Sequence, residues 1–307
     1  MTIVITGSLG HIGRPLTREL VGRGHDVTVV SSKADRRAEI EGLGAQAAIG
    51  LLEDLRFLTD TFRGADAVFV LIAPGGAFAD PHLDIDTRFH QIGETCARAI
   101  EASGVTKMVY LSSIGADLPS GTGLLRLHHK MEAFLDKFRS LAITFLRPAG
   151  FYTNLLGYIP AIKARGVIAA GYGEQAGPWV SPADIATAAA EELEALPEVP
   201  AGTRKVRYVA SQELTGSEVA RVLGQAIGKP DLKWVEVPGE QIKQGLVAAG
   251  MVVAIADAMV EMQASQKSGR LSEDYYRHRP ALGRVKLQEF AQEFQAAYET
   301  YSLQDHH

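Results

Sequence analysis

Three glycines after a short apolar segment at the start of the chain constrain the fold more than any other feature. Residues 3–5 (Ile-Val-Ile) are β-branched and predict a buried strand that ends before Gly7. Gly10 and Gly13 follow at the same three-residue spacing. Residues 12–20 then place an apolar side chain at every fourth position, as on the buried face of a helix. This order of strand, glycine turn and helix predicts the first unit of a dinucleotide-binding sheet.

Each glycine has a distinct role in such a turn. Gly7 permits the tight turn, Gly10 lets a pyrophosphate approach the backbone, and Gly13 lets the helix pack close to the strand. The phosphates are then expected on free N–H groups at the helix N-terminus, where the helix dipole favours negative charge. The residues expected to contact the nucleotide here are Gly7, Ser8, Leu9, Gly10, His11, Ile12 and Gly13.

Composition and charge narrow the class of protein. The chain has 307 residues, and its 46% hydrophobic and 22% charged residues are ordinary for a globular protein. A net charge of −5 offers no overall attraction to nucleic acid, so we expect a small-molecule substrate as the partner. The single cysteine, Cys96, excludes an internal disulfide framework and is expected to be a small buried apolar residue.

We expect no leader segment before the first strand, and no apolar run approaches the ~20 residues that cross a bilayer. We therefore expect a cytoplasmic protein that does not associate with a membrane and holds no metal. We expect it to be either a monomer or a homodimer.

Strand and helix patterns alternate over the first two-thirds of the chain. This alternation predicts right-handed βαβ crossovers and an α/β fold with a doubly wound parallel Rossmann sheet. The predicted strands are 3–5, 26–30, 45–49, 67–72, 107–111 and 142–146, and the predicted helices are 34–43, 55–62, 84–103 and 125–138.

The alternation loosens after residue 148. A helical segment over 154–165, a capped helix from Ser181 to Leu196 and a linker at 197–202 precede two short strands and mostly helical sequence. We predict a nucleotide-binding domain over 1–150, to which 178–196 return. Residues 151–177 and 197–307 are then expected to form a smaller, mostly helical substrate-binding lid.

The end of the second strand indicates which nucleotide is bound. NAD-binding units place Asp or Glu about twenty residues beyond the glycines, to accept the ribose hydroxyls. Here the chain has hydroxyls and cations instead, which suit a 2′-phosphate. We therefore favour NADP(H) over NAD(H), with Ser31, Ser32, Lys33 and Arg36 as ligands. The alternative is that these cations form only the solvated start of a helix.

Five motifs together give the chain a resemblance to the NmrA-like branch of the atypical short-chain dehydrogenases/reductases. The Leu-Arg-Pro segment with its following Phe and Asn is more specific than the glycine turn. The motifs are Thr6–Gly13, Val105–Gly115, His128 with Glu132, Thr144–Pro148 followed by Phe151 and Asn154, and Val180–Ala186.

The resemblance implies a Rossmann domain that carries NADP(H) beside a small α/β domain. The family includes NADPH-dependent reductases of quinones and dyes, and regulatory proteins that bind the nucleotide without turnover. Many relatives have an Asp near the adenine after the third strand, where this chain has Gly50-Leu51.

The wider superfamily uses a Tyr and a Lys four residues later, with a Ser at the end of the preceding strand. Here Ser112 ends that strand and is expected near the cofactor, but the chain has no tyrosine between Tyr110 and Tyr152. The standard dyad is therefore absent, which disfavours alcohol oxidation and sugar epimerisation by that route.

His128 lies where NmrA-like relatives carry a His or Lys beside the nicotinamide ribose, and it is our candidate catalytic residue. An imidazole there is able to bind the ribose, orient the cofactor or supply a proton near neutral pH. The alternative is a helix-face histidine paired with Glu132 through the i,i+4 relation. We expect His129 and Lys130 to be solvated.

Further candidates lie where ligands bind in open α/β sheets, at the carboxyl edge. Ala73 and Pro74, after the fourth strand, are expected to leave room for the cofactor ribose. Phe151, Tyr152 and Asn154 follow the sixth strand and, with Trp179, are candidates to contact the substrate. Packing in the core is the alternative for Phe151 and Trp179.

Two functions fit these observations. The first is an NADPH-dependent reductase of an acceptor that takes hydride without a tyrosine acid, such as a quinone. The second is a regulator that binds NADP and signals the bound nucleotide to a protein partner. Binding needs only the glycine turn and the cationic patch over residues 31–36.

Overall fold

The computed structural model describes residues 1–72, 80, 82, 84–195 and 199–301, and the chain divides into two compact units. Unit 1 comprises residues 1–116, 127–147 and 185–207. Unit 2 comprises residues 117–126, 148–184 and 208–307.

Unit 1 is built on a seven-stranded sheet in the order β10-β6-β5-β4-β1-β2-β3. Its strands are β1 (Thr2–Ile5), β2 (Asp26–Ser31), β3 (Gln46–Ile49), β4 (Ala67–Val70), β5 (Lys107–Leu111), β6 (Ala142–Pro148) and β10 (Arg204–Val209). β1 pairs in parallel with β2 and with β4, so the chain leaves β1 in one direction along the sheet and later returns on its other side. β2–β3, β4–β5 and β5–β6 are also parallel. The predicted doubly wound Rossmann sheet is confirmed.

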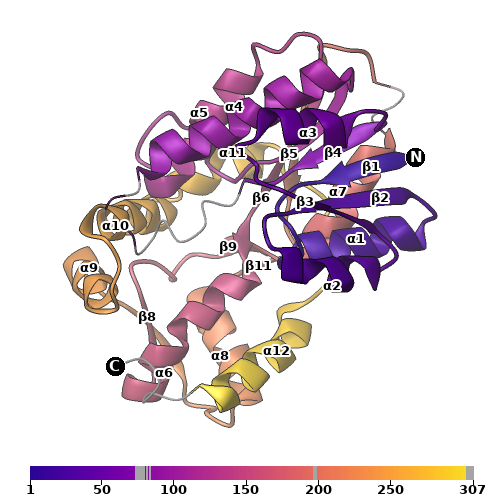
Figure 1. Cartoon of the computed structure of the whole chain (residues 1–307). Helices are drawn as coiled ribbons and strands as arrows, with labels where there is room; N and C mark the ends of the chain where they lie inside the picture. The colour runs from indigo at the N-terminus through magenta and orange to yellow at the C-terminus, as the bar shows by residue number, and fades with distance from the viewer. Residues whose placement is uncertain (73–79, 81, 83, 196–198, 302–307) are drawn as a thin grey trace. The chain divides into compact units, whose positions relative to one another are not determined.

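Helices cover both faces of this sheet. Figure 1 shows α3 (Leu55–Phe62), α4 (Ile85–Ser103) and α5 (Arg126–Leu135) on one face. On the other face lie α1 (Gly13–Gly22), α2 (Arg37–Glu41) and α7 (Pro182–Ala195). Because both faces are covered, β4 is buried at every residue, as its continuous apolar sequence predicts.

Local sequence signals explain where several helices begin and end. The Asp84 side chain accepts hydrogen bonds from the amides of Asp86 and Thr87 at the start of α4, and Gly104 ends that helix with φ 85°. Asp54 caps α3 through the amide of Phe57. In unit 2, Thr215 and Glu218 form a capping box at the start of α8 (Gly216–Ala226).

Three predicted helices are shorter than expected. Residues 34–43 contain a 3₁₀ turn (Ala34–Arg36) followed by only five residues of α2. The helix predicted over 125–138 ends at Leu135, and a 3₁₀ turn over Gly123–Leu125 precedes it. In the predicted helix over 154–165, a 3₁₀ turn (Tyr152–Tyr158) comes first and α6 covers only Ile159–Arg165. Residue spacing does not separate a 3₁₀ turn from the first turn of an α-helix, since 3₁₀ turns are frequent at helix ends.

Unit 2 contains two small sheets and several helices. β11 (Gln212–Leu214), β9 (Gly177–Val180) and β7 (Gly150–Phe151) form one sheet, and β12 (Lys233–Glu236) pairs with β8 (Val167–Ala170) in the other. The helices are α6 (Ile159–Arg165), α8, α9 (Gly239–Ala248), α10 (Val253–Lys267), α11 (Glu273–Arg277) and α12 (Leu287–Thr300), and 3₁₀ turns cover Tyr152–Tyr158 and Arg270–Ser272.

The core of unit 2 is rich in aromatic side chains. Tyr152, Trp179, Phe290 and Phe294 pack in one buried cluster, against which Trp234 is partly buried. The rings of Tyr152 and Phe290 stack with centroids 5.8 Å apart.

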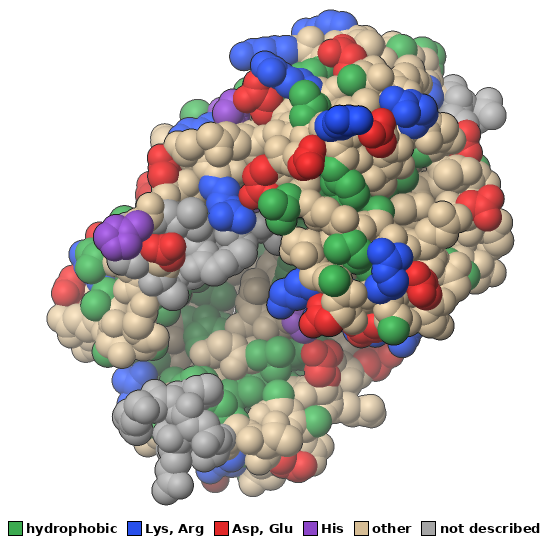
Figure 2. Space-filling view, viewed as in Figure 1, with side chains coloured by type: hydrophobic (Ala, Val, Ile, Leu, Met, Phe, Trp, Pro, Cys, Tyr) green, Lys and Arg blue, Asp and Glu red, His purple; other side chains and the backbone are tan. Residues whose placement is uncertain are grey.

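Charges of both signs are mixed on the surface. On the face drawn in Figure 2, Lys and Arg side chains are interspersed with Asp and Glu among the residues that the structure describes. Within those same residues, no helix is both long and apolar enough to span a bilayer.

Candidate functional site

The glycine turn follows β1 directly and is held by hydrogen bonds to two neighbouring strands. The Thr6 hydroxyl donates to the carbonyl oxygen of Leu71 (3.1 Å) and accepts from the Leu71 amide (2.9 Å). The amide of Ser8 donates to the carbonyl oxygen of Val30 (3.1 Å). Gly7 has φ 89°, and Ser8 has φ 61°, a conformation that non-glycine residues rarely adopt. These bonds to flanking strands hold the backbone in a conformation that is intrinsically strained.

The three glycines are needed for different reasons. A Cβ on Gly7 would lie 2.7 Å from a Leu71 side-chain atom, and one on Gly13 would lie 1.9 Å from the carbonyl oxygen of Ser8. A Cβ on Gly10 would meet no atom within 4 Å. Gly7 and Gly13 are therefore required by the protein's own packing, whereas the space at Gly10 is open to a ligand.

Backbone donors are available at this opening. Within the described chain, the structure records no hydrogen bond donated by the amides of Gly10, His11 and Ile12, which immediately precede α1. The side chains of Leu9 and Ile12 are buried, so these two predicted contact residues offer a ligand their backbone rather than their side chains. Open amides at a helix N-terminus fit the pyrophosphate of a dinucleotide.

The end of β2 carries hydroxyls and cations, as the sequence indicates. The buried Ser31 hydroxyl lies 3.1 Å from the Ser8 hydroxyl and accepts from the Lys33 amide (3.2 Å), while Ser32 and Lys33 are exposed. Arg36 is not free, because it forms an ion pair with Glu39 (2.6 Å), to which Arg14 also binds. These two arginines hold the pKa of Glu39 below its usual value. Two arginines share this one carboxylate, so positive charge remains in excess at Glu39, which suits a 2′-phosphate.

A buried polar network joins β5, α5 and β6. The Arg147 guanidinium donates to both carboxylate oxygens of Glu132, at 3.0 and 2.6 Å. The Ser112 hydroxyl donates to the same carboxylate at 2.5 Å. All three residues are less than 10% exposed. Because its proton points to Glu132, the Ser112 hydroxyl offers a ligand its oxygen lone pairs.

His128 does not pair with Glu132, so that alternative is wrong. Its Nδ1 lies 2.9 Å from the hydroxyl of Tyr110 on β5, and the Phe89 ring packs edge-on against the imidazole at 5.3 Å. Burial lowers the pKa of His128 to about 4 and raises the pKa of Tyr110 well above its usual value. Both groups are therefore neutral at neutral pH. We assign the Tyr110 hydroxyl as the donor to Nδ1, because the structure records no other acceptor for it among the described residues. In this assignment the proton of the imidazole lies on Nε2, as a hydrogen-bond donor.

The low pKa of His128 bears on its predicted roles. A neutral imidazole is able to bind or orient a ribose, whereas an imidazolium acid is almost absent at neutral pH. Lys130 is exposed, as predicted, and pairs with Asp86 (2.6 Å). His129 is not solvated as expected, because its Nδ1 lies 2.8 Å from the carbonyl oxygen of Ala116.

The candidate substrate residues lie in unit 2 in different environments. Tyr152 is fully buried, its hydroxyl donates to Gln212 (2.9 Å), and burial raises its pKa. Asn154 is exposed and Phe151 is partly buried. Trp179 belongs to the core cluster, and it also lines a cavity of this unit.

Asp184, in one of the motifs that carry the resemblance, has a structural environment. Its carboxylate accepts from the Ser211 hydroxyl at 2.5 Å and from the amides of Arg284 and Val285 at 3.1 Å each. It therefore fixes the segment before α12.

The sequence also makes predictions about three further residues, Ala73, Pro74 and Cys96, and about metal binding. Ala73 and Pro74 lie outside the described residues. Cys96 is fully buried, and burial raises the pKa of its thiol to about 12, which confirms that it is an inert apolar residue. Among the described residues there is no group of three or more His, Cys, Asp or Glu arranged to hold a metal ion.

Sequence reasoning missed Tyr110, Arg14 and the pairing of Arg147 with Glu132. The spacing of residues along the chain provided a signal for the contacts of Tyr110 and Glu132. Tyr110 and Ser112 are two residues apart on a strand and so share a face, and His128 and Glu132 are four apart on a helix. The structure joins these two pairs as Tyr110–His128 and Ser112–Glu132.

Comparison with known proteins identifies the family. A model of the family described as NAD(P)H-binding matches residues 7–195. The chain therefore belongs to this NAD(P)H-binding family, which agrees with the resemblance to the NmrA-like branch.

Two curated relatives are reductases. The chain is 29% identical to an NAD(P)H azoreductase of Xenophilus azovorans over 264 residues, which cover 85% of this chain and 86% of the relative. It is 26% identical over 269 residues to a (4-alkanoyl-5-oxo-2,5-dihydrofuran-3-yl)methyl phosphate reductase of Streptomyces griseus, with 87% and 88% of the chains covered.

Two solved structures share the fold. The NADPH-dependent quinone oxidoreductase of Escherichia coli, complexed with NADPH, superposes with a TM-score of 0.73 at 21% identity, covering 95% of this chain and 99% of that one. The triphenylmethane reductase of Citrobacter superposes with a TM-score of 0.72 at 21% identity, covering 96% and 100%.

Proposed function

We propose that this protein is an NADPH-dependent reductase of an aromatic electrophile such as a quinone. The observation that carries the proposal is the open space at Gly10 beside amides that the described chain leaves without acceptors, in a turn that the rest of the fold holds in place. The reductase activities named for the two curated relatives support it.

The residues of unit 1 divide the work of holding the nucleotide. The amides of Gly10, His11 and Ile12 would bind the pyrophosphate, and Ser31, Ser32, Lys33 and Arg36 would surround the 2′-phosphate. We propose Ala73 and Pro74 as neighbours of the ribose. When bound, NADPH supplies a hydride to the acceptor.

The type of acceptor follows from the lack of an acid. His128 is not an imidazolium at neutral pH, the raised pKa of Tyr110 makes its hydroxyl a poor proton donor, and the Tyr–Lys dyad is absent from the sequence. A quinol anion is a much weaker base than an alkoxide and needs little help from an acid. We propose that the Nε2–H of His128 donates a hydrogen bond to the nicotinamide ribose, and that Phe151, Tyr152, Asn154 and Trp179 belong to the acceptor-binding unit. Tyr152 is fully buried, so we propose that it supports the acceptor-binding residues through core packing and does not contact the acceptor.

Steady-state oxidation of NADPH with a panel of quinones, azo dyes and triphenylmethane dyes tests the proposal. We expect turnover with at least one aromatic acceptor and faster turnover with NADPH than with NADH. Equal affinity for the two nucleotides would contradict the assignment of the cationic patch.

A second candidate is a nucleotide-sensing regulator, and the same absence of an acid favours it. Such a protein would bind NADPH with the same selectivity, but it would not oxidise NADPH in the presence of any acceptor. A partner captured only in the presence of NADP(H) would support this function, whereas acceptor-dependent turnover would exclude a purely regulatory role.

A further inference from the structure

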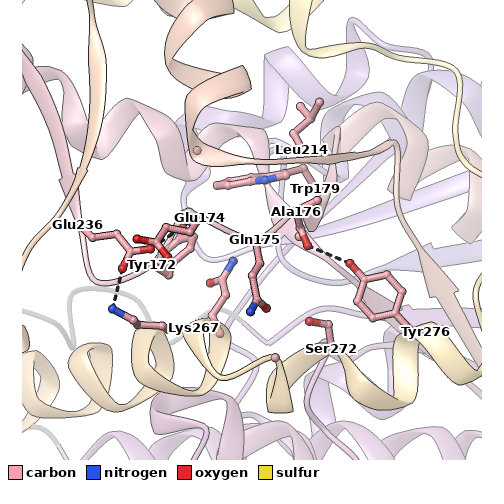
Figure 3. Close-up of a pocket in the computed structure, with 15 residues that line it drawn as sticks. Tyr172, Glu174, Gln175, Ala176, Trp179, Leu214, Glu236, Lys267, Ser272 and Tyr276 are labelled. Atoms are coloured by element: carbon pink, nitrogen blue, oxygen red, sulfur yellow. Dashed lines mark hydrogen bonds and ion pairs between the residues drawn. The ribbon is translucent and has the colours of Figure 1, made fainter.

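Unit 2 contains a cavity of about 120 Å³ whose lining residues all belong to that unit. The segment 172–179 forms one side together with Leu214 and Gly216, and residues of the 266–276 segment form the other. Figure 3 shows Trp179 and Leu214 on one side of the view, Lys267 and Ser272 on the other, and Gln175 between them.

Flat apolar groups form part of the wall. The Trp179 indole is packed into the core and is only 4% exposed, so its orientation is fixed before any ligand arrives. The Tyr276 hydroxyl donates to the carbonyl oxygen of Ala176 (3.1 Å), which holds the second ring at the rim. Fixed aromatic surfaces of this kind suit a planar ring, which binds them by stacking or by edge-to-face contact.

Two uncharged polar side chains at the cavity have no recorded partner. Ser272 is only 7% exposed as a residue, and the structure records no hydrogen bond of its hydroxyl with a described residue. The hydroxyl is not among the fully enclosed side-chain atoms that lack a partner, so it keeps access to the cavity that it lines. Gln175 is exposed, and its side-chain amide has no recorded partner among the described residues. Both groups are therefore free to bind the carbonyl or amide group of a ligand.

The charged groups at the cavity select against anions. Glu236 pairs with Lys267 (2.6 Å), and its pKa is lowered by that bond. Glu174, which also lines the cavity, adds a second carboxylate without a second cation. One carboxylate in excess disfavours a ligand with a negative charge.

We propose that this cavity binds a single uncharged aromatic ring that carries a carbonyl or amide group. The cavity volume of about 120 Å³ is somewhat below the ~150 Å³ of an apolar cavity that holds benzene, so it limits the ligand to a single small ring. Trp179 and Tyr276 would contact the ring, and Ser272 and Gln175 would bind its polar group. The proposal does not depend on reductase activity, because it concerns binding to unit 2.

The two tryptophans of the chain provide a direct test. Trp179 lines the cavity, and Trp234 lies 6.4 Å from it between ring centroids, so intrinsic fluorescence reports on this region. The full-length protein without nucleotide is titrated with benzamide and with benzoate, which have the same size but differ in charge. We expect a saturable change with benzamide at a Kd on the order of 1 mM, a typical affinity for so small a ligand. Benzoate should bind roughly fivefold more weakly or worse.

Two matched variants locate the binding. Ser272→Ala should weaken benzamide binding roughly fivefold through the lost hydrogen bond. Ser268→Ala, whose hydroxyl donates to the carbonyl oxygen of Ser265 and does not line the cavity, should not change it. Gly177→Leu should abolish binding by filling the space, with thermal unfolding as the check on folding. No saturable change with benzamide, equal binding of benzoate, or equal effects of the two serine variants would overturn the proposal.

Discussion

The buried side-chain network of unit 1 and the cavity of unit 2 differ in how their polar side chains are satisfied. In unit 1, Ser112, Glu132 and Arg147 satisfy one another, and Tyr110 does the same for His128. In unit 2, the hydroxyl of Ser272 faces a cavity without a recorded partner among the described residues. A network that is satisfied without a ligand is a rigid frame, whereas an unsatisfied donor is a binding determinant. We infer that unit 1 is built for one cofactor and that unit 2 sets which acceptors are taken.

The largest expected effect comes from breaking the buried ion pair of unit 1. Glu132→Ala leaves Arg147 buried without its carboxylate partner, which typically costs about 3–5 kcal/mol. Urea unfolding measures this loss of stability. Lys130→Ala, which breaks an exposed pair on the same helix, is the control and should cost less than about 1 kcal/mol. Equal losses would show that the network is not the rigid frame described here.

A second test separates packing from ligand binding within the glycine turn. Gly13→Ala forces a Cβ against the Ser8 carbonyl oxygen and should destabilise the protein by about 1–3 kcal/mol. Gly10→Ala adds a Cβ in open space and should leave stability unchanged, yet weaken NADPH binding roughly tenfold by occupying the approach to the backbone. Thermal unfolding and nucleotide titration of both variants decide this. A stability loss at Gly10 equal to that at Gly13 would remove the argument for a ligand there.

A third test uses the low pKa of His128. Its folded pKa of about 4 is below its ordinary value of 6.5, so the unfolded chain takes up a proton first as the pH falls. The contribution of the neutral imidazole to stability is therefore full above pH 6.5 and is lost between pH 6.5 and about 4. Urea unfolding of the wild type and of His128→Gln at several pH values isolates this contribution. The wild type should lose more stability than the variant over that range, and parallel losses would contradict the burial of a neutral His128.

The smallest expected effect is that of Tyr110→Phe, which removes one hydroxyl from a buried strand. Loss of the bond to Nδ1 should weaken NADPH binding by about 0.5–1.5 kcal/mol, because the imidazole then distributes its proton over both nitrogens. The same change in a His128→Ala background should have no further effect on NADPH affinity. Additive effects would show that Tyr110 acts independently of His128.

The sequence was a good guide where short-range chemistry decides the structure. The glycine turn, the strands over 107–111 and 142–146 and the capped helix after Ser181 follow from local patterns that no later packing overrides. The substrate-binding residues are harder to predict from the sequence. An apolar or aromatic residue type in a loop does not indicate whether its side chain packs in the core or contacts a ligand. Tyr152 shows this, since its hydroxyl is satisfied by Gln212, sixty residues further along the chain.

Polar pairs between residues far apart in the sequence were the other feature that could not be predicted from the sequence. His128 and Glu132 are correctly spaced for a helix pair, but each found a better partner on a strand, in Tyr110 and Arg147. Such a choice depends on how helix and sheet pack, which the spacing of residues on one helix does not determine. The cationic patch was predictable as a set of residues, whereas its neutralisation in part by Glu39 needed the structure.

The central claim, that unit 1 delivers reducing equivalents from NADPH to an aromatic acceptor, is tested most directly by a single-turnover measurement. The protein is loaded with one equivalent of NADPH and mixed rapidly with a naphthoquinone, while the absorbance of the reduced nicotinamide is followed. We expect acceptor-dependent loss of that absorbance, faster than without protein and slowed in Gly10→Ala. Nucleotide that binds with selectivity for NADPH but stays reduced with quinones and dyes alike would contradict the claim and leave the sensing function in its place.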